Sequence, residues 1–542
     1  MRASVLALIL CQASCGRTEE ADGRPGSSPA RSPILFISFD TLGAEHTSLH
    51  GYSRDTTPIM AGLGEESVVF ERCLANAPYT RASYVSQFSG LLPSCSSVDR
   101  EAFREKHGRA PRTWEVFRIT EGRRTLTETL RAGGYRTAAF IDNHNAGEAF
   151  GIGQGFEHFD TGAADVAMPD SESGIRRIVP AVLAWIDSLP RGTPFFVFVN
   201  AADTHKPYLP GPDFLDRYKG DTDGEPDAEY PVGIGGFGVV DMEHVEDYFQ
   251  EPPFPTRMRT APIVARYDEE VLRLDQDFGR LIAGLREREL LDDMLLVISA
   301  DHGEAMGQPD FKFGHGTHVE QVLHVPLLMR FPGRRYGGLR IAAPVQLLDL
   351  YPTLADWAGL EAPDYLQGQS LLPLLDGGSL GERSFVHETG RLTTTSVSEG
   401  HWRLAVSYPG ASNHCVLSAR GRAWLAENHP ELGGDYFVVT GLNRRLASDP
   451  RARAILLEAR AALKGPFFEL FDTRDDPHLL RDLAQEKPEI VARLRQRLQA
   501  SQELSRTERT RMPVQAVAFE HPMDLEELRR LGYVGDDGEV DD

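Results

Sequence analysis

Residues 34–40 read ILFISFD, an apolar run interrupted only by Ser38 and followed by an aspartate. A short run rich in β-branched and aromatic residues is typical of a strand buried on both faces of a sheet. Four similar runs follow along the chain: Thr137–Ile141, Pro194–Val199, Leu295–Ser299 and Val325–Arg330. Helical patterns lie between them. The sequence therefore predicts a large α/β domain with a mostly parallel or mixed central sheet sandwiched by helices.

Two of the intervening segments have clear helical signals. Residues 125–132 begin with Thr125 and Glu128 in capping-box spacing and end before two glycines. Over 262–289, apolar residues recur every three or four positions, as on one face of a helix. They are Ile263, Tyr267, Val271, Leu274, Phe278, Leu281 and Leu285.

The pattern changes near residue 376. Shorter, more polar strands are expected at Trp402–Ser407 and Phe467–Phe471, followed by a basic helix over 488–500. We expect a main domain over 33–375, a smaller C-terminal α+β subdomain over 376–500 and a tail over 501–542.

The first fifteen residues have the composition of an export signal, with Arg2 before an apolar run. Small residues precede Cys15, as in bacterial lipoprotein signals, and residues 16–32 have the composition of a flexible tether. We expect an exported protein, either a periplasmic or cell-surface lipoprotein attached to the membrane through a lipidated Cys15, or a secreted protein. Oligomeric state is not predicted.

The formal net charge is −23, and most of it lies in two segments. Residues 211–251 hold twelve Asp/Glu against two basic residues, and 534–542 hold five acidic residues and no basic one. A surface of this sign does not attract a phosphate polymer, so nucleic acid is not an expected partner. Outside the signal, Cys73, Cys95 and Cys415 allow at most one disulfide, so disulfides do not hold the fold together.

Residues able to carry chemistry follow three of the predicted strands. Asp40 follows the first strand, Asp301 and His302 follow another, and Asp203 and His205 follow a third. In open α/β sheets, ligands bind at the carboxyl ends of the strands. We expect these side chains to meet at one edge of the sheet.

Several segments, in chain order, resemble the sulfatase family of the alkaline phosphatase superfamily. ILFISFDTLGAEHTSLHGY (34–52) and LLVISADHGE (295–304) are similar to its two metal-binding motifs. The other matching segments are 314–326, 344–375 and 469–483. The resemblance implies an alkaline phosphatase-like fold and a metal-dependent hydrolase of sulfuric or phosphoric esters.

The resemblance assigns the metal ligands to Asp40, Asp301, His302 and Thr80. Oxygen and imidazole donors suit one divalent ion, Ca²⁺ or Mn²⁺ first and Mg²⁺ or Zn²⁺ as alternatives. The family often has a second aspartate after the first, where this chain has Thr41.

The nucleophile position departs from the family. Sulfatases carry Cys or Ser in Cys/Ser-x-Pro-Ser-Arg, which is converted to formylglycine, whereas the matching residues 80–84 are TRASY. Threonine cannot give this aldehyde, so the chain lacks formylglycine. A metal-bound threonine hydroxyl is an alternative nucleophile. It favours phosphate or phosphonate over sulfate, because water can release a phosphoryl group from threonine by in-line attack, whereas a sulfo-threonine lacks the release route of a formylglycine hydrate.

The remaining site predictions are also carried over from the resemblance. Thr80, His205 and His315 are the predicted catalytic residues, with His315 where many sulfatases have a lysine. Arg81, Tyr84, Lys206 and His144 are the predicted substrate-binding residues, with Asn143 and His318 as weaker candidates. The substrate is expected to be a small or polymeric anionic ester.

Two other functions remain open at this point. One is a two-metal phosphodiesterase in which Asp203, His205 and His318 bind the second ion. The other is a degenerate sulfatase-like domain that binds an anionic glycan or a partner without turnover.

Overall fold

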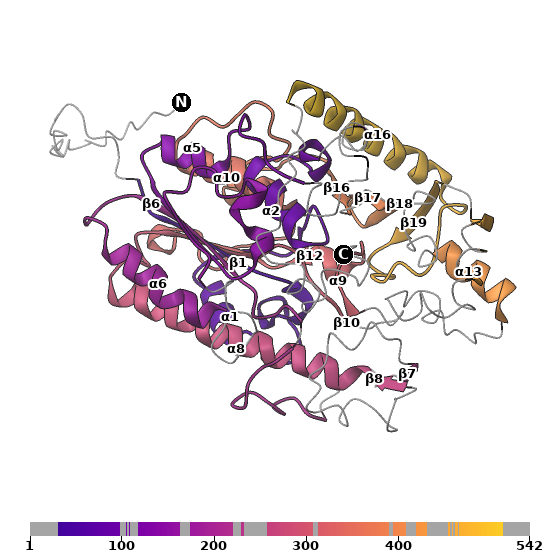
Figure 1. Ribbon diagram of the computed structural model, residues 1–542, viewed down its shortest axis with the longest axis horizontal. Helices are drawn as coiled ribbons and strands as arrows, with labels where there is room; N and C mark the ends of the chain where they lie inside the picture. Colours follow the sequence, from indigo (N-terminus) through magenta and orange to yellow (C-terminus); the bar gives the residue numbers. More distant parts are fainter. Residues whose placement is uncertain are drawn as a thin grey trace, which may run out of the picture. The chain divides into compact units, whose positions relative to one another are not determined.

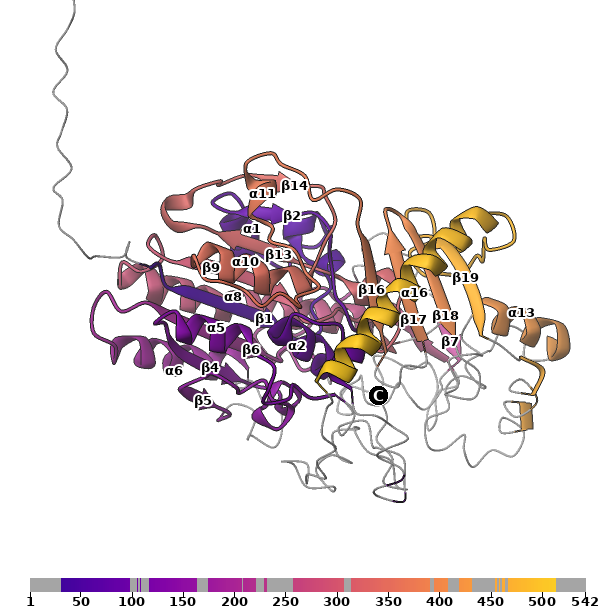
Figure 2. The same ribbon diagram turned by 90° about the horizontal axis from the view of Figure 1, so that it is seen from above.

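A central sheet dominates the computed structural model (Figure 1), and among the described residues it contains strands in the order β14-β2-β13-β9-β1-β6-β4-β5 (Figure 2). The structure describes residues 31–97, 117–162, 174–206, 208–220, 257–306, 313–389, 394–407, 419–430 and 466–512, with the strand Glu229–Pro231 and a few isolated positions. The sheet strands are β1 (Ile34–Phe39), β2 (Val68–Phe70), β4 (Arg136–Ile141), β5 (His158–Asp160), β6 (Phe195–Ala201), β9 (Leu295–Ala300), β13 (Leu327–Arg330) and β14 (Arg340–Ile341).

The middle of the sheet is parallel and its edge is mixed, as predicted. β1 pairs in parallel with both β6 and β9, and β4 pairs in parallel with β6 and β5. β13 runs antiparallel to β9 and β2. Every residue of β1, β6 and β9 is buried, which explains their continuous apolar sequences.

Helices cover both faces of this sheet (Figures 1 and 2). One face carries α1 (Pro58–Gly64), α6 (Ile175–Asp187) and α8 (Thr260–Glu287), and the other carries α2 (Thr80–Ser89), α5 (Leu126–Ala132) and α10 (Leu350–Trp357). The predicted helices are confirmed. Thr125 caps α5 through a capping box with Glu128, and the seven periodic apolar residues of α8 are buried.

The predicted strand Val325–Arg330 is wrong in one respect, because it is divided at Pro326. β12 (His324–Val325) pairs with β3 (Cys73–Leu74) in a small sheet that also contains β15 (Val345–Gln346), whereas β13 belongs to the central sheet. Proline has no N–H to donate to a ladder, so the chain changes sheets there.

The C-terminal part contains an antiparallel sheet of β16 (Ser384–Glu388), β17 (Thr394–Glu399), β18 (Trp402–Ser407) and β19 (Phe467–Asp472). Helix α16 (Pro488–Arg511) packs on it (Figure 2), with Leu494 and Leu498 in one apolar cluster with Leu404 and Leu470. This agrees with the predicted α+β arrangement. The other elements are α9 (Glu320–Leu323), α11 (Leu372–Leu375), α13 (Ala419–Asn428), β7 (Glu229–Pro231), β8 (Arg257–Arg259), β10 (Ala305–Met306) and β11 (Phe313–Gly314).

The predicted boundary at residue 500 is also wrong, because α16 continues through it to Arg511. Arg123 of the main domain is buried and donates to the Glu508 carboxylate at 2.8 Å and to the Glu508 carbonyl at 2.7 Å. The last turns of α16 are therefore held by a buried ion pair, which the local sequence does not reveal.

Residues Ser32–Asp542 form one unit, separate from Met1–Arg31. Within the described part of the chain, no helix is long and apolar enough to cross a membrane. Cys73 and Cys95 are buried free thiols. The predicted export signal and tether, together with Cys15, Cys415, most of residues 221–251 and residues 513–542, lie outside the described residues.

Candidate metal centre and active site

Three parallel strands bring the candidate residues to one edge of the sheet. In the register of β1, Phe39 lies opposite Ala201 of β6 and Ala300 of β9. Asp40 and Asp301 therefore leave their strands at the same level, and the segment after β6 carries Asp203 and His205. The predicted meeting of strand ends is confirmed.

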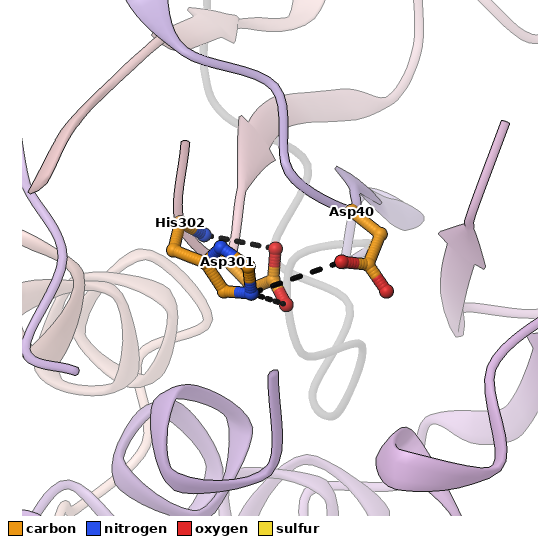
Figure 3. Close-up of side chains that lie close together, drawn as sticks. All are labelled: Asp40, Asp301 and His302. Atoms are coloured by element: carbon orange, nitrogen blue, oxygen red, sulfur yellow. Dashed lines mark hydrogen bonds and ion pairs between the residues drawn. The ribbon is translucent and has the colours of Figure 1, made fainter. Parts of the chain in front are cut away.

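Asp40, Asp301 and His302 converge at this edge (Figure 3). His302 Nε2 lies 3.5 Å from Asp301 Oδ2 and 3.8 Å from Asp40 Oδ1, and all three side chains are fully buried. Thr80, the first residue of α2, places Oγ1 3.4 Å from both Asp40 Oδ1 and His302 Nε2. The four predicted ligand side chains thus surround one point.

The unsatisfied atoms of this cluster fit a cation. Asp301 Oδ2 is buried without a hydrogen-bond partner. His302 Nδ1 lies 2.9 Å from the Gly303 carbonyl, which accepts only from an N–H, so Nε2 turns its lone pair toward the carboxylates. Burial, with the neighbouring Asp40, raises the pKa of Asp301 well above its usual range. A divalent ion bound by these oxygen and imidazole donors would give Asp301 Oδ2 a partner and would favour the ionised form of its carboxylate.

The outer carboxylate oxygens are held by other groups. Asn143 Nδ2 donates to Asp40 Oδ2 at 2.6 Å, and Asp301 Oδ1 accepts from the backbone N–H groups of His302 and Thr41 at 2.8 and 3.2 Å. Hydrogen bonds of this kind, from groups that do not themselves touch a metal, orient metal ligands. Asn143, a weaker candidate in the sequence, is a direct partner of the cluster.

His205 and His315 extend the site beyond the metal ligands. The ring centroid of His315 lies 4.6 Å from that of His302 and 5.5 Å from that of His205. Burial, with the nearby His302, His205 and Lys206, lowers the pKa of His315 well below its usual range, so its ring is neutral at pH 7. The two predicted catalytic histidines are neighbours.

Glu304 is a site residue that the predictions missed. Its side chain is fully buried, and Oε2 lies 3.1 Å from His315 Nδ1. Burial raises the pKa of Glu304, and the nearby Lys206, His205 and His302 oppose this rise. The residue stands in the matched segment 295–304, but its partner is brought to it by the pairing of β10 with β11. Lys206 Nζ and Glu304 Oε1 both lie next to Gly314, so the lysine is close to this group.

Arg81 and His144 lie on the side of the cluster formed by the segment after β4. Arg81 donates to Asn145 Oδ1, and its guanidinium lies 4.0 Å from the centroid of the Phe150 ring. His144 begins the short helix η4 (His144–Ala146), directly after Asn143, and is half-buried. Arg81 directly follows Thr80 in the sequence, and His144 directly follows Asn143, whose side chain donates to Asp40.

The prediction that Tyr84 binds substrate is wrong. Tyr84 is fully buried under α2, where its hydroxyl donates to Ser38 Oγ and accepts from Asn200 Nδ2, both at 2.9 Å. Its ring packs edge-on against Phe198. The residue is part of the core between α2 and the sheet, out of reach of a ligand.

The geometry does not support a second metal at Asp203, His205 and His318. Asp203 Oδ2 accepts from the N–H of Ile175 at 2.9 Å and Oδ1 lies 3.4 Å from Arg273, so both carboxylate oxygens already have protein partners. His318 lies instead toward the C-terminal sheet, near His387, and its carbonyl accepts from Arg403. Among the described residues, Asp40, Asp301 and His302 are the only group of three metal-ligating side chains that converge.

Comparison with known sequences gives a consistent result. A sequence model of the protein family Sulfatase matches residues 32–360. Delta 4,5-hexuronate-2-O-sulfatase from Bacteroides thetaiotaomicron is 24% identical over 474 residues, which are 83% of this chain and 90% of that protein. Steryl-sulfatase from Mus musculus is 33% identical over 246 residues, 40% of this chain and 39% of that protein. Arylsulfatase K from Mus musculus is 32% identical, but the match spans only 27% of its length.

Solved structures share the fold over nearly their whole length. The phosphonate monoester hydrolase of Agrobacterium radiobacter has a TM-score of 0.60 at 16% identity, covering 88% of this chain and 96% of that one. A protein solved in complex with its substrate D-glucosamine-2-N,6-O-disulfate has the same TM-score and identity, covering 88% and 98%. At these identities the similarity establishes the architecture alone.

Proposed function

The chain belongs to the sulfatase family, and we propose that it is a metal-dependent hydrolase of an anionic ester, phosphate or phosphonate in preference to sulfate, with Thr80 as the nucleophile. The observation that carries this proposal is the position of the Thr80 hydroxyl, 3.4 Å from both Asp40 Oδ1 and His302 Nε2. A hydroxyl that only capped a helix would not need to lie among three metal-ligating side chains.

Asp40, Asp301, His302 and Thr80 would hold one divalent ion. When bound, the ion would lower the pKa of the Thr80 hydroxyl and offset negative charge on the ester. The donor set of carboxylate oxygens with one imidazole is compatible with Mn²⁺ or Ca²⁺, and with Mg²⁺ or Zn²⁺ as alternatives.

The reaction would proceed in two displacements at phosphorus. Thr80 Oγ1 attacks phosphorus as its proton passes to solvent, the bond from phosphorus to the leaving oxygen breaks, and His205 gives that oxygen a proton. Water then attacks the phospho-threonine and gives a proton to His205, the bond from phosphorus to Thr80 breaks, and the Thr80 oxygen takes up a proton from solvent. The neutral His315, bonded to Glu304, is placed beside His205 to bind the ester or the attacking water.

Thr80 also supports the preference for phosphorus. A formylglycine hydrate expels sulfate with its second hydroxyl, and a threonine has only one. The family's arginine and lysine positions hold Tyr84, which is buried, and His315, which is neutral. Arg81, Lys206 and His144 are the remaining residues proposed to bind the anionic substrate.

The test is a comparison of four esters with purified protein lacking residues 1–15. The substrates are p-nitrophenyl sulfate, p-nitrophenyl phosphate, bis-p-nitrophenyl phosphate and a p-nitrophenyl phosphonate monoester, each with Mn²⁺, Ca²⁺, Zn²⁺ or chelator. Metal-dependent turnover of a phosphorus ester above that of the sulfate supports the proposal. Bound metal without turnover of any ester would favour a binding domain.

We also propose a main domain over 33–375 that carries the catalytic residues.

We propose, in addition, that the chain is exported with lipid attached at Cys15. The small residues before Cys15 support the lipid attachment. Labelling of a bacterial host with radioactive palmitate tests it: label on the wild-type protein and none on Cys15→Ser supports the proposal, and an unlabelled wild type contradicts it.

A further inference from the structure

Thr41, the residue after the metal ligand Asp40, has a backbone conformation that threonine rarely adopts. Its φ is 60°, in the left-handed region, and the residue is fully buried. A β-branched residue in this region is strained, because Cβ and its substituents crowd the backbone. Such strain persists only where the surrounding structure enforces it, and it is common at functional sites.

Three separate elements hold Thr41 in this conformation. Its N–H donates to Asp301 Oδ1 at 3.2 Å, after β9. Its carbonyl accepts from the Tyr267 hydroxyl of α8 at 2.7 Å. Its own hydroxyl donates to the carbonyl of Thr204 at 2.7 Å, in the segment after β6. Every polar group of the residue is thus used to join parts of the site.

The bond to Thr204 is half of a reciprocal pair. Thr204 Oγ1 donates in return to the carbonyl of Asp40, and both threonines are fully buried. The pair therefore joins the segment that carries the metal ligand Asp40 to the segment that carries His205. Where many sulfatases have a second acidic residue, this chain has a hydroxyl directed to the neighbouring segment.

We propose that Thr41 is a positioning residue that fixes His205 relative to Asp40 through its hydroxyl bond to Thr204. This inference rests on the proposed function, in which His205 protonates the leaving oxygen. Loss of the hydroxyl releases the segment after β6, so proton transfer to the leaving group suffers more than metal binding does. The effect is largest for alkyl esters, whose leaving oxygens need a proton most.

Thr41→Ser and Thr41→Ala form a matched pair, because both remove the branch at Cβ and they differ by one oxygen. We expect Thr41→Ser to keep kcat within about threefold of wild type and Thr41→Ala to lower kcat at least ~10-fold on an alkyl ester and less on a p-nitrophenyl ester. Metal content should be equal in the two variants. In a His205→Ala background, Thr41→Ala should cause no further loss, because both changes remove the same proton transfer.

Hydrogen exchange gives a readout that does not depend on turnover. Peptides covering 200–206 should exchange faster in Thr41→Ala than in Thr41→Ser, whether or not the wild type hydrolyses the chosen ester. A wild type without turnover would refute the proposed function and leave this measurement to decide the positioning role. Equal exchange in the two variants would overturn the inference. Equal kcat values in Thr41→Ala and Thr41→Ser would also overturn the inference. So would a loss of kcat from Thr41→Ala that is as large in the His205→Ala background as in the wild type.

Discussion

The Asn143 side-chain amide donates a 2.6 Å hydrogen bond to Asp40 Oδ2. Asp40 lies at the end of β1 and Asn143 follows β4, so the bond joins segments from two strands that both pair with β6. It leaves Oδ1 of Asp40 facing Thr80 and His302. The orientation of one carboxylate thus depends on a residue a hundred positions away in the sequence.

We expect Asn143→Ala to weaken metal affinity about 10- to 100-fold, the usual effect of losing a bond that orients a ligand. Titration of the metal-free protein with Mn²⁺ measures this directly. Asn145→Ala is the matched control, because Asn145 is two residues away and contacts Arg81 in place of Asp40. Equal affinities in the two variants would show that the Asp40 contact does not orient the ligand.

Glu304 and His315 should act as one unit. Glu304 Oε2 is within hydrogen-bonding distance of His315 Nδ1. Removing the Glu304 carboxylate therefore leaves the His315 ring without this contact, and His315→Ala removes the ring itself. We expect Glu304→Gln and His315→Ala each to lower kcat about 10- to 100-fold, and the double variant to lose little more than either one. Steady-state kinetics of the three variants checks this, and additive losses would mean that the two side chains act separately.

Acid should destabilise the fold through a buried histidine outside the site. Burial and the nearby Arg403 lower the pKa of His387 from 6.5 to about 3, and its two ring nitrogens contact Ala75 O and Ser398 Oγ. Below pH 6.5 the His387 ring binds a proton in the unfolded chain but not in the folded chain. Its contribution to the free energy of unfolding is therefore fully present above pH 6.5 and is lost progressively as the pH falls toward 3. Each unit of pKa difference is worth about 1.4 kcal/mol.

Urea unfolding at pH 7.5 and pH 5 measures this loss. We expect His387→Gln to show a smaller difference in unfolding free energy between the two pH values than wild type. The exposed His158 gives a control, since His158→Gln should leave the difference unchanged. A wild-type-like difference in His387→Gln would exclude this ring as a source of the acid sensitivity.

The end of α16 should matter for stability despite its polar sequence. Replacing Arg123 with methionine leaves the buried Glu508 carboxylate with the exposed Arg511, 3.7 Å away, as its remaining ion-pair partner, and loss of the buried partner costs about 3–5 kcal/mol. Thermal unfolding should show the drop, whereas Arg497→Met, on the exposed face of the same helix, should change stability by less than ~1 kcal/mol. Similar losses in both variants would contradict a specific role for the buried pair.

The central strands were predictable because β1, β6 and β9 are buried on both faces and therefore apolar throughout. The end of α16 was not, because Ser505 and Glu508 are polar and yet buried. Their partners, Cys95 and Arg123, lie 410 and 385 residues away. A local pattern contains no record of such contacts.

The convergence of Asp40, Asp301 and His302 was predictable from strand ends and from the family's motifs, since parallel register aligns Asp40 with Asp301. The position of Tyr84 in the core was not predictable, because all ten residues of α2 are buried and no amphipathic face distinguishes core residues from site residues. Glu304 was missed because its role depends on His315, which a hairpin brings to it.

The central claim is that the Thr80 oxygen is the nucleophile of a metal-dependent hydrolase. Its most direct test is kcat for a p-nitrophenyl phosphonate monoester in wild type, Thr80→Ser and Thr80→Val, each with the same bound metal. We expect measurable turnover in Thr80→Ser and a loss of more than ~10³-fold in Thr80→Val, which keeps the shape of threonine without its hydroxyl. Turnover by Thr80→Val at the wild-type rate would contradict it.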